Sequence, residues 1–191
     1  MFEKALEKIA LALDEGRIRY MIIGGHAVLL HGEPRLTRDI DITLGVTVEK
    51  LDVVLKLAKG IGLNPLVDPE TFTRKTMVLP CEDPQTGIRV DFIFSFSPYG
   101  QQAIERSLSV KMGRSRVKFA SPEDLIVHKV FAGRPRDLED VKSVLIKNPK
   151  IDFNYIRNWL KEFENVTEDP FLVRFNTIVK ESGTTTGSHL F

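Results

Sequence analysis

Two aspartates lie two residues apart in Asp39–Leu44, a segment in which acidic and aliphatic residues alternate. Alternation with a period of two predicts a β-strand with two different faces, so the carboxylates of Asp39 and Asp41 should point the same way. Like charges at this separation repel each other and burial penalises both, so we expect a cation between them. Hard oxygen ligands of this type suit magnesium, with manganese as an alternative.

A glycine pair precedes the aspartates. Gly24 and Gly25 follow the apolar run Tyr20–Ile23 and precede a helical pattern at residues 27–30, which predicts a strand, a glycine turn and a helix. Glycine at such a turn lets the backbone approach a phosphate, and the free amides of the helix N-terminus favour an anion there. A tight structural turn is the alternative, and the acids that follow favour phosphate binding.

A third acid, Asp91, lies between apolar residues in Arg89–Phe94, which predicts another strand. We expect this strand to neighbour the one that carries Asp39 and Asp41. Three carboxylates that face a phosphate-binding turn are what two-metal phosphoryl-type transfer requires. The alternative for Asp91 is a buried ion pair with an arginine, either Arg38 or Arg89.

The remaining pattern predicts strands followed by helices. We expect helices at residues 1–16 and 48–59, a hairpin of 76–79 with 88–94, and a strand pair at 110–112 and 117–120. From Ser121, helices are predicted around 125–131, 138–146, 155–163 and 171–179. This indicates an α+β fold with a catalytic domain at 1–120, a helical part at 121–181 that completes the site, and a flexible tail at 182–191.

Four charged residues cluster where the second of these C-terminal helices begins: Arg134, Arg136, Asp137 and Asp140. Asp137 and Asp140 lie one turn apart on one face, so a network at the helix start is one interpretation. Arg136 and Asp137 are the stronger candidates for a functional role. The histidines His26 and His31 lack the spacing of metal ligands, so we expect neither to bind a metal.

Two segments resemble a known family: Gly24-Gly25-His26-Ala27 and Arg35-Leu36-Thr37-Arg38-Asp39-Ile40-Asp41. They look like the signature of minimal nucleotidyltransferases of the DNA polymerase β-like superfamily. The Arg-x-Thr-x-Asp-x-Asp form is similar to that of AbiEii-type toxin nucleotidyltransferases and their uncharacterised relatives. The resemblance extends to Asp91, to residues 121–125, to Lys129 and to residues 136–141, so it spans about 21–145.

The resemblance implies a mixed sheet flanked by helices and a role for each matching residue. Gly24 and Gly25 would hold the nucleoside triphosphate, Asp39 and Asp41 would bridge two magnesium ions, and Asp91 would bind the ion that activates the attacking hydroxyl. Lys129 would reach the triphosphate. Further residues on the nucleotide side would be Arg35, Thr37, Arg136 and Asp137. For Arg35 and Thr37, ordering of the loop before the acids and a salt bridge to the site are alternatives.

The leading hypothesis is therefore transfer of a nucleoside monophosphate from a triphosphate such as ATP to a hydroxyl acceptor, with release of pyrophosphate. The acceptor stays open between tRNA or other RNA, a protein and a small molecule, and a toxin would need an antitoxin protein as its partner. One alternative is a catalytically silent nucleotide-binding or partner-binding protein that keeps the fold. A nucleotide-sugar glycosyltransferase ranks last, because it leaves the glycine pair and Asp91 unexplained.

Composition and charge limit the partners and the compartment that the sequence predicts. The 27 basic and 26 acidic residues among 191 nearly cancel, so the net charge of the chain does not by itself indicate a protein that binds nucleic acids or membranes. The only cysteine, Cys81, excludes an intrachain disulfide and fits the cytoplasm. Residues 106–118 carry five basic residues and no acid, which indicates either an RNA footprint or, by default, a solvated hairpin face. The aromatic residues are better explained as core than as a base-stacking platform: Phe92, Phe94, Phe96, Phe119 and Phe131.

Overall fold

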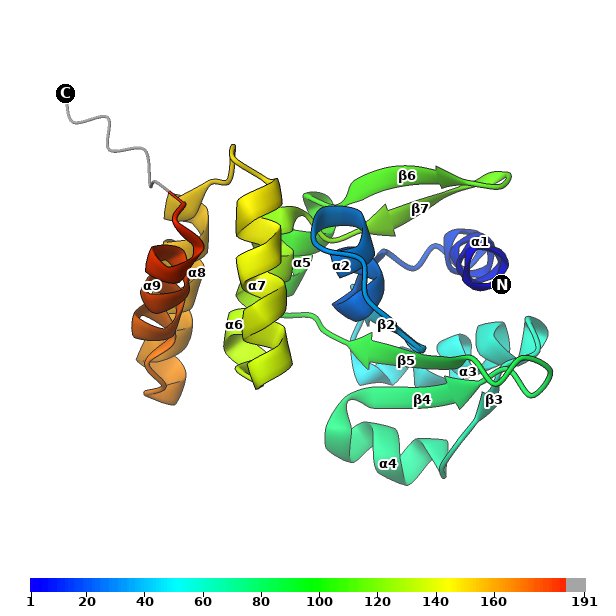
Figure 1. Ribbon diagram of the computed structural model, residues 1–191. Coiled ribbons are helices and arrows are strands. Elements are labelled where there is room, and N and C mark those ends of the chain that lie inside the picture. The colour runs from blue at the N-terminus through cyan, green and yellow to red at the C-terminus, as the bar shows by residue number, and fades with distance from the viewer. Residues whose placement is uncertain (185–191) are drawn as a thin grey trace. The chain divides into compact units, whose positions relative to one another are not determined.

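The computed structural model describes residues 1–184 and divides the chain into two compact units (Figure 1). The first unit consists of Met1–His26 and Leu36–Ala120, and the second of Ala27–Arg35 and Ser121–Phe191. The chain therefore crosses from one unit to the other after His26, after Arg35 and after Ala120. Of the tail expected at 182–191, residues 185–191 lie outside the described residues.

The first unit contains a mixed sheet, which in the described residues has the order β3-β4-β5-β2-β1-β7-β6. Two neighbouring pairs, β1 with β7 and β2 with β5, are parallel, and the others are antiparallel. The strands are β1 (Tyr20–Ile23), β2 (Asp39–Leu44), β3 (Asn64–Pro65), β4 (Val78–Glu82), β5 (Arg89–Phe94), β6 (Leu108–Met112) and β7 (Ser115–Phe119). The predicted α+β class, the strand that carries the paired aspartates and both predicted hairpins are confirmed, although β4 begins at Val78 and not at residue 76, because Thr76 belongs to a helix.

Alternating burial gives the central strands two faces. In β2, Ile40 and Ile42 are fully buried, whereas Asp39 is exposed and Asp41 is half-buried. In β5, Val90 and Phe92 are buried and Asp91 is half-buried. The aliphatic face of each strand thus supplies the core that holds the strand in place, and the acids occupy the opposite face.

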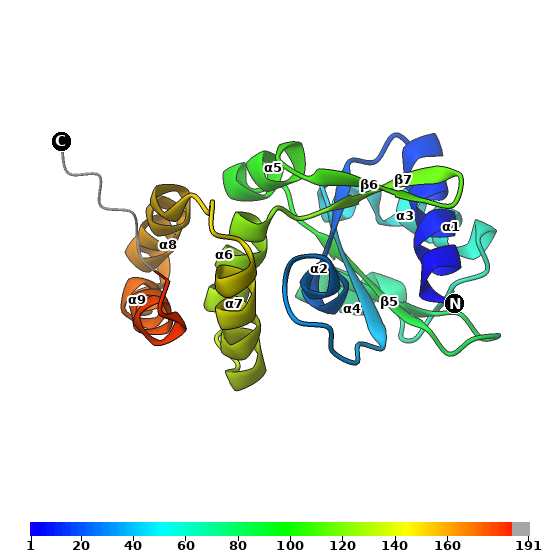
Figure 2. The same ribbon diagram turned by 45° about the horizontal axis from the view of Figure 1, so that its top comes forward.

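The helices assigned to the first unit are α1 (Phe2–Glu15), α3 (Leu51–Gly60), α4 (Pro69–Thr76) and α5 (Pro98–Glu105), with a 3-10 turn at Val48–Lys50. The apolar stripe of α1, which includes Leu6, Ile9 and Leu13, is buried, and α1 contacts α3, β6 and β7. Figure 2 shows α1 beside α3. Helix α2 (Gly24–His31) begins in the first unit and ends in the second.

The second unit is built from α6 (Pro122–Ala132), α7 (Pro135–Lys147), α8 (Phe153–Thr167) and α9 (Phe171–Ser182), as the sequence predicted. Each helix packs against two or three of the others around a buried apolar core that includes Leu125, Val141, Ile156 and Phe175. Ser121 caps α6 by accepting a hydrogen bond from the Asp124 amide. No helix within residues 1–184 is both long and apolar enough to cross a bilayer.

Candidate active site

Three acids come together through the register of two parallel strands. Asp41 in β2 pairs directly with Asp91 in β5, and Asp39 pairs with Arg89. Neighbouring strands are about 4.8 Å apart, so Asp41 and Asp91 are adjacent across the sheet. Asp39 lies two residues from Asp41 on the same strand and therefore on the same face. The structure thus brings together the three carboxylates that the sequence singled out.

Asp91 lies in surroundings that disfavour its charge. Burial and then the nearby carboxylate of Asp39 raise the pKa of Asp91 above its usual range, and Arg89 only partly offsets this rise. The Arg89 guanidinium lies 3.8 Å from the carboxylate of Glu82. A half-buried acid beside a second acid is a place that a divalent cation would stabilise.

The glycine pair packs closely against the acids and the loop that leads to them. Gly24 has a φ of +62°, and a Cβ added to it would lie 2.8 Å from Cγ of Asp41. A Cβ added to Gly25 would lie 2.7 Å from Cβ of Thr37. The Thr37 hydroxyl donates a long hydrogen bond of 3.5 Å to the Asp39 carbonyl. Glycine is therefore required at both positions to seat Asp41 and Thr37 against the start of α2.

His26 follows the glycine pair and is buried. Its ring lies 4.9 Å from the ring of Phe2, and its Nε2 has no hydrogen-bond partner among the described residues. Burial lowers the pKa of His26, and the nearby Asp39 partly offsets that effect. Burial thus favours the neutral form of this imidazole.

The donor atoms of the site suit a hard cation. Among the described residues, no three His, Cys, Asp or Glu side chains already form a closed metal cluster. Magnesium does not need one, because it commonly takes one or two carboxylates and fills its remaining positions with substrate phosphates and water. The oxygens of Asp39, Asp41 and Asp91, together with the raised pKa of Asp91, fit that pattern.

In the second unit, Lys129 lies at the centre of a buried charge network. Its Nζ is 2.9 Å from Asp137 and 2.6 Å from Asp140, and all three side chains are 7% exposed or less. Arg134 pairs with Asp137 at 2.6 Å. Burial alone would raise the pKa of Asp137, but hydrogen bonds from Lys129 and Arg134 hold it below its usual range. Lys129 and Asp137, both of which were expected to contact the nucleotide, thus form an ion pair with each other.

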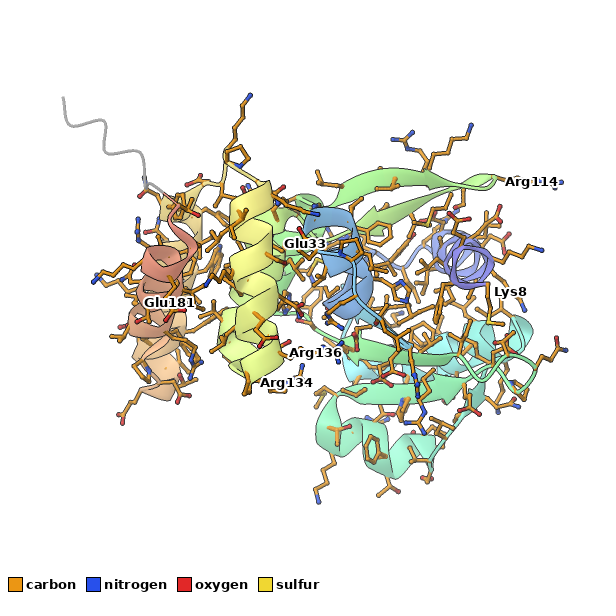
Figure 3. All side chains as sticks on the ribbon, viewed as in Figure 1. Lys8, Glu33, Arg114, Arg134, Arg136 and Glu181 are labelled. Carbon is orange, nitrogen blue, oxygen red and sulfur yellow. The ribbon has the colours of Figure 1, made fainter. Side chains whose placement is uncertain are left out.

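Arg35 belongs to the same network. Its Nε and Nη2 donate to the two carboxylate oxygens of Asp140 at 2.8 and 2.9 Å, which is the bidentate geometry that suits arginine. The salt-bridge alternative for Arg35 is therefore present, with Asp140 as its partner. Arg136 is exposed, and Figure 3 shows it close to Arg134 at the start of α7.

One face of α7 also holds the segment that precedes the acidic loop. We call residues 31–35 the strap. Side chains near the end of α7 donate to its carbonyls, Asn148 to His31 at 2.7 Å and Lys147 to Gly32 at 3.2 Å. The strap amide of Glu33 donates to the Ser143 hydroxyl at 3.2 Å. Sequence reasoning missed Ser143, Lys147 and Asn148, although their spacing from Asp140 places them along one side of the helix.

A mixed sheet that holds carboxylates on neighbouring parallel strands, with a glycine turn against one of them, is the arrangement of the polymerase β-like nucleotidyltransferase fold. Residues 2–175 match the family described as nucleotidyl transferase of unknown function (DUF2204). The chain belongs to this family. A comparison with curated proteins gives no match.

Solved structures share the fold. An antigenic nucleotidyltransferase-like protein from Paracoccidioides brasiliensis is similar with a TM-score of 0.55 and 18% identity, over 93% of this chain and 91% of that one. ANT(2")-Ia, solved in complex with adenylyl-2"-tobramycin, is similar with a TM-score of 0.51 and 16% identity, over 94% of this chain and 97% of that one. At these identities, the similarity shows the fold.

Proposed function

We propose that this chain is a magnesium-dependent nucleotidyltransferase that moves a nucleoside monophosphate from a nucleoside triphosphate, such as ATP, to a hydroxyl acceptor. The observation that carries the proposal is the direct pairing of Asp41 with Asp91, with Asp39 on the same face and Gly24 against Asp41. A purely structural role would not favour three acids on one sheet face, because their mutual repulsion destabilises the fold.

Each residue has a part in this reaction. The backbone amides at the start of α2 bind the triphosphate, which can approach them closely because Gly24 and Gly25 have no side chains. Asp39, Asp41 and Asp91 would hold magnesium, or manganese in its place, and the metal would supply charge neutralisation on the phosphates. Asp91, which pairs with Asp41 across the two strands, would accept the proton of the acceptor hydroxyl. The hydroxyl oxygen forms a bond to the α-phosphorus, and pyrophosphate leaves.

The donor side of the reaction is better supported than the acceptor side. A fold neighbour was solved with adenylyl-2"-tobramycin, which carries an adenylyl group on a small molecule. We also propose that Lys129, Arg136, Asp137 and Thr37 contact the nucleotide, and this part of the proposal rests on the family resemblance. A toxin role with an antitoxin partner is an extension of the same proposal. A reducing compartment such as the cytoplasm suits the buried free thiol of Cys81.

The test is pyrophosphate release and label transfer from labelled triphosphates with magnesium, screened over purified tRNA, total RNA and small hydroxyl compounds. The double variant Asp39→Asn/Asp41→Asn should lose at least about 100-fold of the activity, since the charge that holds the metal is gone. Asp52→Asn, an exposed acid on α3, is the matched control and should retain it. Full activity in the double variant would contradict the proposal.

The catalytically silent alternative makes a different prediction. It expects triphosphate binding by calorimetry with no release of pyrophosphate under any acceptor. Binding that is lost in Asp39→Asn/Asp41→Asn together with transfer supports the enzyme, whereas binding without transfer over the whole acceptor screen supports the silent protein.

A further inference from the structure

The hairpin β6–β7 carries a concentration of positive charge that the proposed transfer chemistry does not use. Between residues 106 and 118 there are five basic residues and no acid: Arg106, Lys111, Arg114, Arg116 and Lys118. Lys111, Arg114 and Arg116 are all exposed. The hairpin belongs to the first unit and forms one edge of the sheet that holds the three aspartates.

Two acids of α1 contact the hairpin, but neither forms a recorded ion pair with Lys111, Arg114 or Arg116. Glu7 accepts a hydrogen bond of 2.6 Å from the backbone amide of Arg114, and Asp14 lies 3.7 Å from Lys118. The guanidinium of Arg116 donates to the carbonyl of Ser109 at 3.2 Å. Within residues 1–184, the structure records no ion pair for Lys111, Arg114 or Arg116. Their charges are therefore available to an external anion.

The register forces two of these cations together. Lys111 on β6 lies directly opposite Arg116 on β7, and like charges in directly opposite positions destabilise a hairpin. Arg114 follows Gly113 in the turn between the two strands, and Figure 3 shows it at the outer tip of the hairpin. Protection of an edge strand against aggregation would need a cation on β6 only. The cations on the turn and on β7 do not contribute to that protection.

We propose that the β6–β7 hairpin binds the phosphodiester backbone of a nucleic acid through Lys111, Arg114 and Arg116. A narrow two-stranded ribbon with a cationic tip fits along a polyanionic strand, and guanidinium groups bind phosphate in a bidentate manner. A membrane surface is a poorer match, because membrane-bound elements set exposed apolar residues beside their cations. Here Val117 and Phe119 are buried, and the exposed Leu108 lies at the end of the hairpin far from the turn.

The position of the hairpin relates this surface to the aspartates. Strand β6 is three strand spacings from β2, about 14 Å across the sheet, and the register of β1 with β2 and with β7 places Arg116 about 13 Å along the strands from the level of Asp41. A nucleic acid whose terminal hydroxyl reached Asp39 and Asp41 would present to the hairpin backbone phosphates that lie about 20 Å from that end. Use of the surface for an acceptor rests on the proposed function, whereas binding itself does not.

The experiment measures binding of the full chain to a fluorescent single-stranded RNA over a series of salt concentrations, without nucleotide. The variant Lys111→Gln/Arg114→Gln/Arg116→Gln should bind at least about tenfold more weakly at low salt. Its slope of log K against log salt should be lower in magnitude by about 2, since each lost phosphate contact contributes about 0.7. The control Lys50→Gln/Lys56→Gln/Lys59→Gln removes the same charge from exposed positions near and on α3 and should keep the wild-type slope.

Further arms separate the alternatives. Lys111→Arg keeps the charge and should bind as wild type does. Asp39→Asn/Asp41→Asn should also bind with an unchanged slope, so that a failure of the transfer chemistry is distinguishable from a failure of this surface. Equal weakening in the hairpin and control variants would overturn the proposal, because it would indicate a general charge effect. Selective loss of binding to anionic vesicles or to polyglutamate, with RNA binding intact, would overturn it in favour of a membrane or an acidic protein.

Discussion

Gly24 and Asp41 are in such close contact that the backbone of one leaves no room for a side chain beside the carboxylate of the other. Gly24 also has a left-handed φ of +62°, which side-chain-bearing residues adopt at a cost. A side chain at position 24 would therefore disturb the end of β1, the start of α2 and the carboxylate of Asp41 at the same time.

We expect Gly24→Ala to abolish transfer, with a loss of at least about 100-fold, because the added methyl group displaces Asp41. The strained φ should also lower the free energy of unfolding by about 1–3 kcal/mol. Pyrophosphate release and denaturant unfolding measure the two effects. Gly60→Ala is the control, since nothing lies within 4 Å of its added methyl group and its φ is not left-handed. An active Gly24→Ala protein would show that Asp41 is not held against the glycine turn.

Asp91→Asn should separate stability from activity. The pKa of Asp91 is raised in the folded state, so its contribution to stability is fully present below the ordinary pKa and is lost as the pH rises through the raised value. An asparagine lacks that pH dependence. We expect the variant to be inactive yet more stable than the wild type at neutral pH without metal, and the difference should vanish toward about pH 4.

Thermal melting at a series of pH values, with and without magnesium, checks this prediction. Magnesium should stabilise the wild type more than Asp91→Asn, because a ligand that binds only the folded state raises its stability. A variant that is less stable than the wild type at neutral pH would mean that Asp91 is held by an ion pair.

Asp140→Asn should destabilise the chain strongly, because it leaves Lys129 and Arg35 without their shared carboxylate. Removal of one partner from a buried pair costs about 3–5 kcal/mol. Glu139→Gln, on the exposed side of the same helix, should change the free energy of unfolding by less than about 0.5 kcal/mol.

Adding Lys129→Met and Asp137→Asn to Asp140→Asn should recover part of the loss, because the buried cation is then removed together with both of its carboxylate partners. Hydrogen exchange at residues 31–38 should speed up in Asp140→Asn, since Arg35 no longer ties the strap to α7. Unchanged exchange there would show that the strap is held by Ser143, Lys147 and Asn148 alone.

His128 should make the chain sensitive to acid. Burial lowers the pKa of His128 to about 4, which the charge of Asp124 offsets only in part. The unfolded chain takes up a proton near the ordinary pKa of 6.5 and the folded chain does not, so stability should fall as the pH drops from 6.5 toward 4. His128→Gln should show a shallower fall over that range in denaturant unfolding. An identical pH profile would place the acid sensitivity elsewhere.

Local patterns predicted most of the elements. The alternation in Asp39–Leu44 gave the strand and the shared face of its acids, and Ser121-Pro122 marked the start of α6. The same signal occurs at Asp68-Pro69 and Ser97-Pro98, where a capping side chain and a proline begin α4 and α5, two helices that the sequence analysis did not predict. Both of those helices are only 8 residues long, and α4 is mostly polar, so periodicity alone did not reveal them.

Contacts between distant segments were harder to predict. That Asp91 lies on a strand beside Asp41 could be expected, but nothing in the sequence indicates that β2 and β5 run parallel with these two residues in register. The partners of Lys129 were also beyond prediction, because a lysine on a helix is equally compatible with solvent, phosphate or carboxylate. The pairing depends on how α6 and α7 pack, and helix periodicity does not specify that packing.

The chain passes between the two units after His26, Arg35 and Ala120, and this affects the order in which its contacts can form during synthesis. During synthesis, the strap is complete more than a hundred residues before Ser143, Lys147 and Asn148 are translated, so its anchors form late. A truncated protein that ends at Ala120 would contain every proposed catalytic acid but would lack all of these anchors. We therefore expect the strap of the nascent chain to adopt its final conformation only after the C-terminal helices have been translated, although none of the three acids lies in those helices.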